Sequence, residues 1–291
     1  MLRELEKEIL KLRIAIEKET NKDIRKILSE QKKELENMRE LVGSIYMTYA
    51  DDKGIIDIST VDKFNTMRKV EKEIVKSRNK LAETTIAIVG ASLLKSYVDS
   101  YYKTANIIDK GISININYKL LRKEFVDAVV NANFMNQTYS SRIWNNHNKL
   151  ANKLYDVIGK GISDGTSIPK LSKEIKDAFG SSSYQSTRLI RTEMARVVTE
   201  AQLNIYENSG VVDKVMYVAT LDDRVSEICS SRDGNVWELN DPTKPEIPAH
   251  PNCRSTWVGV IEGYSPTTRR NNITKEQIPY QNFTDWKKDN N

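Results

Sequence analysis

The stretch Ser182–Asn208, SSYQSTRLIRTEMARVVTEAQLNIYEN, carries the strongest helical signal in the chain. Ser182 and, three residues later, Gln185 have the spacing of a capping box, which marks the start of a helix. Ser209-Gly210 then ends the pattern, as glycine commonly does after a helix. Between these limits an apolar residue recurs every three or four positions, the period of a helix with one buried face. The stretch therefore predicts a long amphipathic helix, whose buried face consists of Ile190, Met194, Val197, Ala201 and Ile205.

The placement of proline divides the rest of the chain around this helix. All seven prolines occur at Pro169 or later, and proline interrupts helix interiors because it lacks an amide hydrogen and clashes with the preceding turn. The first ~165 residues can therefore form long helices, whereas the last ~80 must consist mostly of turns, loops and short strands. We expect an α+β fold, with long N-terminal helices followed by a helical and small antiparallel-sheet domain that has a loop-rich C-terminal end.

Periodicity and capping signals place the individual elements. The apolar residues of 1–42 form two seams that are out of phase at Thr20-Asn21, so we expect a kink or an antiparallel turn there. Further helices are expected over 61–102 with Ser59 as the cap, over 118–130, over 142–160, and between Pro169 and Gly180. Residues 112–117 are expected to be a loop or a short extended piece. Strands are expected at 215–219 and 255–261, with a hairpin signal at Asp233-Gly234.

Composition excludes several classes of protein. The 291 residues include 45 Lys and Arg against 40 Asp and Glu, a net charge of +5 that permits an acidic partner without requiring one. Two cysteines cannot build a disulfide framework, which excludes a secreted fold held together by several disulfides. The N-terminus has no apolar core of a secretory signal, and the apolar patch Ile86–Leu94 is far shorter than the ~20 residues of a spanning helix. We therefore expect a cytoplasmic product without a membrane segment.

The densest group of chemically reactive residue types lies near the C-terminal end. Cys229, His250 and Cys253 fall within 25 residues of one another. Thiolates and imidazole are preferred zinc ligands, and a fourth ligand would complete a tetrahedron. Zinc therefore stays possible, but we expect no cofactor and interpret the group as a structural knot that fastens the proline-rich loop 241–251 to the turn after Arg224. The expected members of this structural knot are Asp222, Asp223, Arg224, Cys229, His250, Cys253 and Arg254.

Two enzymatic alternatives use the same region. A cysteine nucleophile could pair with His250, although no G-x-S-x-G signature accompanies it. A metal-dependent hydrolase, such as a nuclease, could use Asp222, Asp223 and His250, with Glu193 as a further carboxylate. Adjacent aspartates at a turn more often cap the following helix. We therefore expect a protein that is not an enzyme.

Arg188, Arg191 and Arg196 on the strongest helix are the candidate contacts to DNA. Residues 142–200 contain ten Lys and Arg against six Asp and Glu. Guanidinium groups can contact phosphates without reading sequence, so such binding would be weak and nonspecific. The same arginines could instead form internal ion pairs with Glu193 or Glu200.

Five sequence blocks occur in an order that resembles a known family. They are RLIRTEMAR (188–196), TLDDR (220–224), SEIC (226–229), Asp233-Gly234 and HPNCRST (250–256). Their order and spacing resemble the head-morphogenesis domain of tailed bacteriophages, the Mu F-like minor head protein family, over residues 140–260. Many members of this family have two pairs of cysteines where this sequence has Ser226 with Cys229 and Cys253 with Ser255. That departure argues against a zinc site with four protein ligands.

The resemblance implies a structural role as a minor capsid protein that supports head assembly or genome ejection. It implies as partners the phage portal protein, capsid or scaffold proteins, and double-stranded DNA bound weakly. It implies a location in the interior of the head of the virion, and in the host cytoplasm during assembly. The corresponding domains would be a helical N-terminal region at 1–140, a head-morphogenesis domain at 141–262 and an irregular tail at 263–291. A DNA-binding accessory module is a further alternative.

Overall fold

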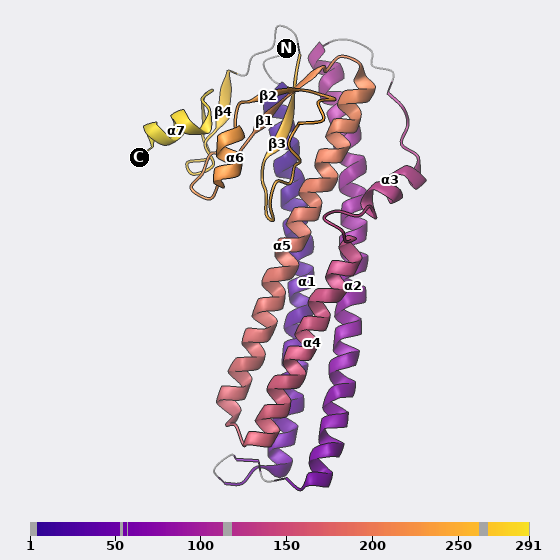
Figure 1. Ribbon diagram of the computed structural model, residues 1–291, viewed down its shortest axis with the longest axis vertical. Helices are drawn as coiled ribbons and strands as arrows, with labels where there is room; N and C mark the ends of the chain where they lie inside the picture. The colour runs from indigo at the N-terminus through magenta and orange to yellow at the C-terminus, as the bar shows by residue number, and fades with distance from the viewer. Residues whose placement is uncertain (1–4, 53–54, 57, 113–117, 262–266, 291) are drawn as a thin grey trace. The chain divides into compact units, whose positions relative to one another are not determined.

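The computed structural model describes residues 5–52, 55–56, 58–112, 118–261 and 267–290. Within this part of the chain, long helices precede a group of short strands (Figure 1). The helices are α1 (Leu5–Tyr49), α2 (Thr60–Ile112), α3 (Lys123–Val130), α4 (Tyr139–Asp164), α5 (Ile168–Ser209), α6 (Glu227–Arg232) and α7 (Phe283–Asp289). The strands are β1 (Lys214–Val218), β2 (Val236–Glu238), β3 (Thr256–Val260), β4 (Thr268–Arg270) and β5 (Gln277–Pro279). The predicted α+β class, with long N-terminal helices and small antiparallel sheets, is confirmed.

The chain forms two compact units, and three long helices take part in both. The sheet unit comprises residues 1–20, 91–132 and 191–291, and the bundle unit comprises 21–90 and 133–190. The unit boundary in α1 lies between Thr20 and Asn21, where the two apolar seams of the sequence change phase. The phase change therefore marks where α1 passes from one core to the other, since each core requires its own buried stripe.

The core of the bundle unit forms where α1, α2, α4 and α5 each contribute an apolar face. Val70, Ile158 and Ile175 are completely buried there. Each belongs to a stripe with helical spacing, so burial of these stripes supplies the main stabilisation of this unit. Other buried members of this core are Met38, Val42, Ile74, Leu81, Leu150, Leu154, Val157, Leu171 and Phe179.

The sheet unit has a three-stranded antiparallel sheet in the order β2-β1-β3. The central strand β1 is buried on both faces after its first residue, as its run of apolar residues requires. One face contributes Met216 and Val218 to a core with Ile9 of α1 and Val258 of β3. On the sheet, Tyr217 and the tryptophans 237 and 257 make edge-to-face contacts with ring centroids 5.2 to 6.4 Å apart. Both predicted strands, 215–219 and 255–261, are confirmed within one residue at either end.

The C-terminal segment was predicted to be an irregular tail, and this is wrong for its described residues. β4 pairs with β5, and α7 buries Phe283 and Trp286 against Leu221. The aromatic residues Phe283 and Trp286 of this segment are both buried, whereas Tyr264 lies outside the described residues. The order of this segment depends on long-range contacts, which local sequence does not reveal.

Two helices are longer than their local signals predicted. α1 runs without a turn through Thr20, whose hydroxyl donates to the carbonyl of Ile16 at 2.9 Å. α5 runs through Gly180, which was expected to end one helix before Ser182 capped the next. Ser182 instead lies buried inside α5, and its carbonyl accepts a hydrogen bond from Asn146 of α4 at 3.2 Å. Continuous packing of α5 in the bundle core outweighs the ~1 kcal/mol that an internal glycine costs.

The boundaries of α2, α3 and α4 also differ from the predicted ones. α2 begins after Ser59, whose hydroxyl accepts from the Asp62 amide at 3.2 Å as predicted, but it continues to Ile112 because Ala105 and Ile108 extend its buried face. Of the predicted loop 112–117, Ile112 is thus helical, and 113–117 lie outside the described residues. α3 begins only at Lys123, since the Leu121 amide donates to Tyr102 instead of joining a helix. α4 starts after Thr138, its cap, and ends at Gly165 with φ 65°, not at Gly159 or Gly161.

Among the described residues, one segment meets the length and composition test for a membrane-spanning helix. It is Val61–Gly111 of α2, which is longer than the apolar patch that the sequence pattern singled out. A buried core helix passes the same test. In α2 the residues Leu81, Val89, Leu93 and Tyr97 are at most 1% exposed, which is the burial pattern of a helix packed against protein. The absence of a membrane partner stays a prediction.

Candidate functional site

Three side chains that could bind a metal converge in the sheet unit. The sulfur atoms of Cys229 and Cys253 and a ring nitrogen of His250 all lie within 4.8 Å of one another. Among the described residues this is the one group of three such side chains close enough to share an ion. Both cysteines are buried and unpaired by any disulfide, and we refer to the three residues as the thiol–imidazole cluster.

Local structure fixes each member of the thiol–imidazole cluster. Ser226 caps α6, accepting from the Cys229 amide at 3.2 Å, which places Cys229 in the first turn of that helix. The Cys253 amide donates to the His250 carbonyl at 3.1 Å, forming a tight turn that passes through Asn252 at φ 62°. The Asn252 amide in turn donates to Thr192 of α5 at 3.0 Å. The end of the proline-rich loop is thus held against α5.

The His250 ring is oriented so that one nitrogen faces the sulfur atoms. Its Nδ1 lies 2.9 Å from the Pro251 carbonyl, which can only accept, so Nδ1 carries the hydrogen. Nε2 then faces Cys229 Sγ at 3.1 Å and Ser226 Oγ at 2.8 Å. Histidines that ligate metals have this arrangement, in which a carbonyl binds one nitrogen and fixes the other as the ligand.

The two sulfur atoms are joined by a hydrogen bond. It spans 3.7 Å, and it lowers the pKa of Cys229 and raises that of Cys253. The Tyr217 hydroxyl also donates to Cys229 at 3.2 Å. A thiolate and an imidazole lone pair at 3.1 Å repel each other unless a proton or a metal cation lies between them. The cluster is therefore a site for a cation or for a thiolate–imidazolium pair.

The spacing of the two sulfur atoms fits zinc, whereas the 3.1 Å between His250 Nε2 and Cys229 Sγ is shorter than the about 3.6 Å that a tetrahedral zinc would impose on these two ligands. Two thiolates bound to one zinc at 2.3 Å in tetrahedral geometry lie about 3.8 Å apart, close to the 3.7 Å between Cys229 and Cys253. A fourth position would fall to a water or to the Ser226 hydroxyl, which already contacts His250. The residues present thus fit the metal as ligands, while the hydrogen bonds described above satisfy the same atoms without it.

A charge pair lies beside the cluster. Both terminal nitrogens of the Arg254 guanidinium donate to the Asp222 carboxylate, Nη2 to Oδ1 at 2.8 Å. Burial alone would raise the pKa of Asp222, but the Arg254 guanidinium and the Arg224 amide outweigh it, so that this pKa lies below its ordinary value. The Asp222 carboxylate is committed to Arg254 and to the backbone, and it does not join the thiol–imidazole cluster.

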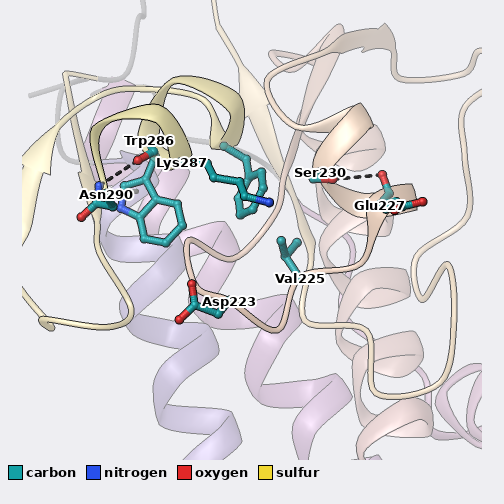
Figure 2. A pocket seen from close by; sticks show the side chains of 8 residues that line it. Asp223, Val225, Glu227, Ser230, Trp286, Lys287 and Asn290 are labelled. Atoms are coloured by element: carbon teal, nitrogen blue, oxygen red, sulfur yellow. Dashed lines mark hydrogen bonds between the residues drawn. The ribbon is translucent and has the colours of Figure 1, made fainter.

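Two predicted members of the structural knot, Asp223 and Arg224, are exposed. Asp223 is exposed and lines a cavity of about 170 Å³ with Val225, Trp286 and Lys287 (Figure 2). Arg224 is exposed and approaches Asp222 at 3.6 Å. The structure therefore brings together Asp222, Cys229, His250, Cys253 and Arg254 in one neighbourhood and leaves Asp223 out of it. This arrangement gives no support to a nuclease centre built on both aspartates and His250.

The three arginines expected to contact DNA differ in environment. Arg196 is buried; it donates to Glu193 at 2.9 Å and to the carbonyls of Val129 and Val130 at the end of α3. The expectation of a DNA contact is wrong for Arg196, because its guanidinium is enclosed by its own fold. Arg188 is half-buried and Arg191 is exposed, and they stay predicted contacts.

Sequence reasoning missed the buried pair of Asp233 and Arg269. The Asp233 carboxylate accepts from Arg269 at 2.6 and 2.7 Å, from the Ala219 amide at 2.7 Å and from the Phe283 amide at 2.6 Å. It thereby connects β1, α6, β4 and α7. The Asp233-Gly234 dipeptide was predicted to form a hairpin, and Gly234 does adopt φ 82° in a turn, but that turn joins α6 to β2. No local signal pairs Asp233 with a residue 36 positions away.

The comparisons with known proteins fall on this region. Residues 152–258 match the family described as Phage Mu protein F like protein, which places the second half of α4, all of α5 and the thiol–imidazole cluster inside the match. Relatives include a minor head protein of Bacillus phage SPP1, 21% identical over 272 residues, or 87% of this chain and 88% of the relative. No solved structure matches.

Two further relatives are larger proteins. An NAD(+)–arginine ADP-ribosyltransferase of Enterococcus faecalis is 23% identical over 209 residues, which cover 66% of this chain and 42% of that protein. An uncharacterized protein of Haemophilus influenzae is 22% identical over 249 residues, which cover 85% of this chain and 53% of that protein. This chain thus spans about half the length of either. The family match and the phage relative confirm the resemblance that the motif string suggested: residues 152–258 of this chain are similar to the Mu F-like minor head proteins.

Proposed function

We propose that this protein is a minor head protein that supports head assembly of a tailed bacteriophage. The observation that carries the proposal is the similarity to the SPP1 minor head protein, which extends over 87% of this chain and 88% of that relative. The match over 152–258 supports it, because it includes the sequence blocks that define the resemblance. A structural role also suits the thiol–imidazole cluster, whose groups hold a loop in place.

The finer proposal is that the protein associates with the portal and lies inside the head. Mass spectrometry of purified virions tests its presence, and co-purification with tagged portal protein tests the contact. We expect both to be positive. A protein that is missing from mature heads and does not bind the portal would contradict the proposal.

A role in assembly and a role in genome ejection give different defects. Phage that lack the protein should produce few DNA-filled heads if it acts in assembly. If it acts in ejection, they should produce normal numbers of filled heads with reduced infectivity. Counting filled heads by electron microscopy alongside infectious particles separates the two. Normal numbers of both filled heads and infectious particles would contradict a role of the protein in the phage head.

Contact with double-stranded DNA is proposed to be weak, nonspecific and salt-sensitive. The net charge of +5 is modest, and each phosphate neutralised adds about 0.9 to the slope of log affinity against log salt. Arg191→Gln should therefore reduce that slope by roughly one if Arg191 contacts a phosphate. Arg196→Gln is unsuitable as a test because Arg196 is buried. Tight, sequence-selective binding at high salt would contradict this proposal.

No enzymatic activity is proposed for this chain. The ADP-ribosyltransferase of Enterococcus faecalis is a longer protein, of which this chain spans 42%, so the shared part need not include its active site. The rival hydrolase hypothesis is tested with His250→Ala. Any hydrolytic activity on DNA that this variant loses, while its circular dichroism and unfolding curve match the wild type, would favour an enzyme.

A further inference from the structure

The fold brings together the two cysteines of this chain, Cys229 and Cys253. Their sulfur atoms lie 3.7 Å apart, although the residues are 24 positions apart in the sequence. At that distance the two atoms are in van der Waals contact, and neither belongs to a disulfide. The thiol–imidazole cluster therefore contains a preassembled pair of thiols.

A disulfide between these residues requires only a small movement. Because the bond is about 2.05 Å long, each sulfur atom would move by less than about 1 Å. Cys229 lies in the first turn of α6, whereas Cys253 lies in a loop that belongs to no helix or strand. Rotation of the two side chains and a small adjustment of this loop would bring the sulfur atoms to bonding distance.

Burial favours a bond within the chain over a bond between chains. Cys229 and Cys253 are 2% and 3% exposed, so the thiols of two folded molecules cannot readily meet. The surface is nevertheless close, because His250, which contacts Cys229 at 3.1 Å, is only half-buried. A small oxidant such as a peroxide therefore suits this site better than a bulky disulfide such as oxidised glutathione.

We propose that Cys229 and Cys253 form a reversible disulfide when the protein meets a peroxide. In the first step the Cys229 thiol gives its proton to His250 Nε2, which faces the sulfur because Nδ1 carries the other hydrogen. The sulfur attacks one peroxide oxygen, and the O–O bond breaks. The leaving hydroxide takes the proton from His250 and becomes water, and Cys229 becomes a sulfenic acid.

Cys253 completes the bond. Its sulfur attacks the Cys229 sulfur, the S–O bond breaks, and the hydroxyl leaves with the Cys253 proton as a second water. In total, two thiols and one hydrogen peroxide give one disulfide and two waters. The two sulfur atoms are oxidised and the two peroxide oxygens are reduced. A dithiol reductant reverses the change by thiol–disulfide exchange.

The disulfide would turn the structural knot into a covalent link between α6 and the loop 250–254. That loop is also held to α5, through the hydrogen bond from Asn252 to Thr192. The biological setting of the switch rests on the proposed function, since the cytoplasm keeps thiols reduced whereas a released phage meets an oxidising medium. The pair would then be a dithiol during assembly and a disulfide in the released particle.

Intact-mass spectrometry and thiol titration of the purified full chain test the proposal. After treatment with hydrogen peroxide, we expect a monomer that has lost both titratable thiols and the mass of two hydrogen atoms. Dithiothreitol should restore both thiols. Thiols that stay unreacted, disulfide-linked dimers, or a gain of oxygen atoms in place of the internal bond would overturn the proposal. One bound zinc per chain that keeps both thiols reduced would also overturn it.

Unfolding temperatures show whether the bond links two parts of the fold. The oxidised wild type should unfold at a temperature roughly 5 °C or more above that of the reduced wild type, because a cross-link restricts the unfolded chain. Cys229→Ser and Cys253→Ser are the matched controls, and peroxide should not raise their unfolding temperatures. The wild-type comparison needs no variant, so it holds even if a serine variant does not fold. Equal unfolding temperatures of the oxidised and reduced wild type would contradict the covalent link.

The rate of oxidation tests the role of His250. His250→Gln should reach the same disulfide at least about tenfold more slowly, since it lacks the proton acceptor. An unchanged rate would contradict this role of His250.

Failure of this proposal can be distinguished from failure of the proposed head function. The reaction is measured on purified protein, so its absence would leave the head function untouched. Differential alkylation of infected-cell lysates and purified virions measures the timing, with thiols expected in the lysate and the disulfide in virions. Reduced thiols in virions that contain the protein would contradict the timing. Absence of the protein from virions would contradict the head function instead.

Discussion

At the scale of single residues, burial decides which groups are available for chemistry. Cys229 and Cys253 are buried and joined by a hydrogen bond, whereas Asp223 and Arg224, which lie close to Cys229 in sequence, are exposed. Arg196 and Arg191 differ in the same way on one helix. Residue type and spacing made all of these residues candidates, but only their environment distinguishes structural groups from accessible ones.

Replacement of either cysteine tests the structural knot. Cys229→Ser and Cys253→Ser should each lower the free energy of unfolding by ~1–3 kcal/mol without loss of any catalytic turnover, because buried contacts at 3.1 to 3.7 Å are removed. Urea unfolding measures the change, with Ser231→Ala, an exposed position on α6, as the control. Elemental analysis of protein purified without chelator separates the alternatives. One zinc per chain, lost with the fold in Cys253→Ser, would favour a metal over hydrogen bonds.

His147 should make the bundle unit sensitive to acid. It is completely buried, and burial lowers its pKa from 6.5 to about 4. The unfolded chain therefore binds a proton at a higher pH than the folded chain does. The contribution of neutral His147 to the free energy of unfolding is fully present above pH 6.5. It is lost as the pH falls from 6.5 towards 4, by on the order of 2–3 kcal/mol in total.

The His147 contribution is measured as a difference between two proteins. Urea unfolding of the wild type and of His147→Leu at pH 7.5, 6 and 5 should show a smaller loss of stability on acidification in the variant. The control variant His250→Gln, which keeps His147, should retain the His147 contribution to the loss of stability on acidification. An equal pH dependence of the free energy of unfolding in wild type and His147→Leu would show that protonation of His147 does not destabilise the folded protein.

At the scale of elements, packing overrode local helix signals. α5 continues through Gly180, although a glycine followed by a capping box predicted an interruption. α1 likewise continues through the phase change at Thr20-Asn21. In both helices, a continuous backbone allows apolar faces before and after the signal to be buried, and this gain exceeds the small local preference for ending the helix.

Gly180 in α5 should be replaceable with a gain in stability. It is exposed, and a β-carbon there would meet no atom within 4 Å. Gly180→Ala should raise the free energy of unfolding by about 0.5–1 kcal/mol, because alanine loses less backbone entropy in a helix. Gly165→Ala is the matched contrast, since Gly165 caps α4 at φ 65° and a β-carbon would lie 2.9 Å from Ile55. It should destabilise, and chemical denaturation that showed the same sign for both would contradict this account.

At the scale of the whole molecule, contacts distant in sequence order the C-terminal segment. Asp233 accepts hydrogen bonds from β4, α7 and the residue after β1, while α7 buries Trp286. The strands and α7 of this segment are too short to be stable alone. Their structure therefore depends on the rest of the sheet unit.

Removal of the Asp233 charge should loosen the sheet unit. Asp233→Asn leaves the Arg269 guanidinium, 2% exposed, without its counter-charge, so we expect a loss of about 3–5 kcal/mol. Glu238→Gln breaks the exposed pair with Lys214 and should cost at most about 1 kcal/mol. Hydrogen exchange of α7 and β4 should accelerate in Asp233→Asn alone. Unchanged exchange there would show that the segment is held by other contacts.

The α+β class, the two five-residue strands of the main sheet and the family resemblance could all be predicted from the sequence. Each depends on local information: the confinement of proline to the second half of the chain, the two-residue alternation of 215–219, and the order of short motifs. The sequence also pointed to the residue types of the thiol–imidazole cluster, because Cys229, His250 and Cys253 fall within 25 residues of one another.

Only the tertiary structure decided which of these residues meet, which are buried and where the elements end. The pairing of Asp233 with Arg269, the enclosure of Arg196 and the continuity of α5 each depend on partners far away in the sequence. A cavity of about 720 Å³ in the sheet unit likewise gathers Arg13, Asn252 and Arg270 from three distant segments. The physical reason is common to all: the free energy of burying a group depends on everything around it, and local sequence specifies only its nearest neighbours.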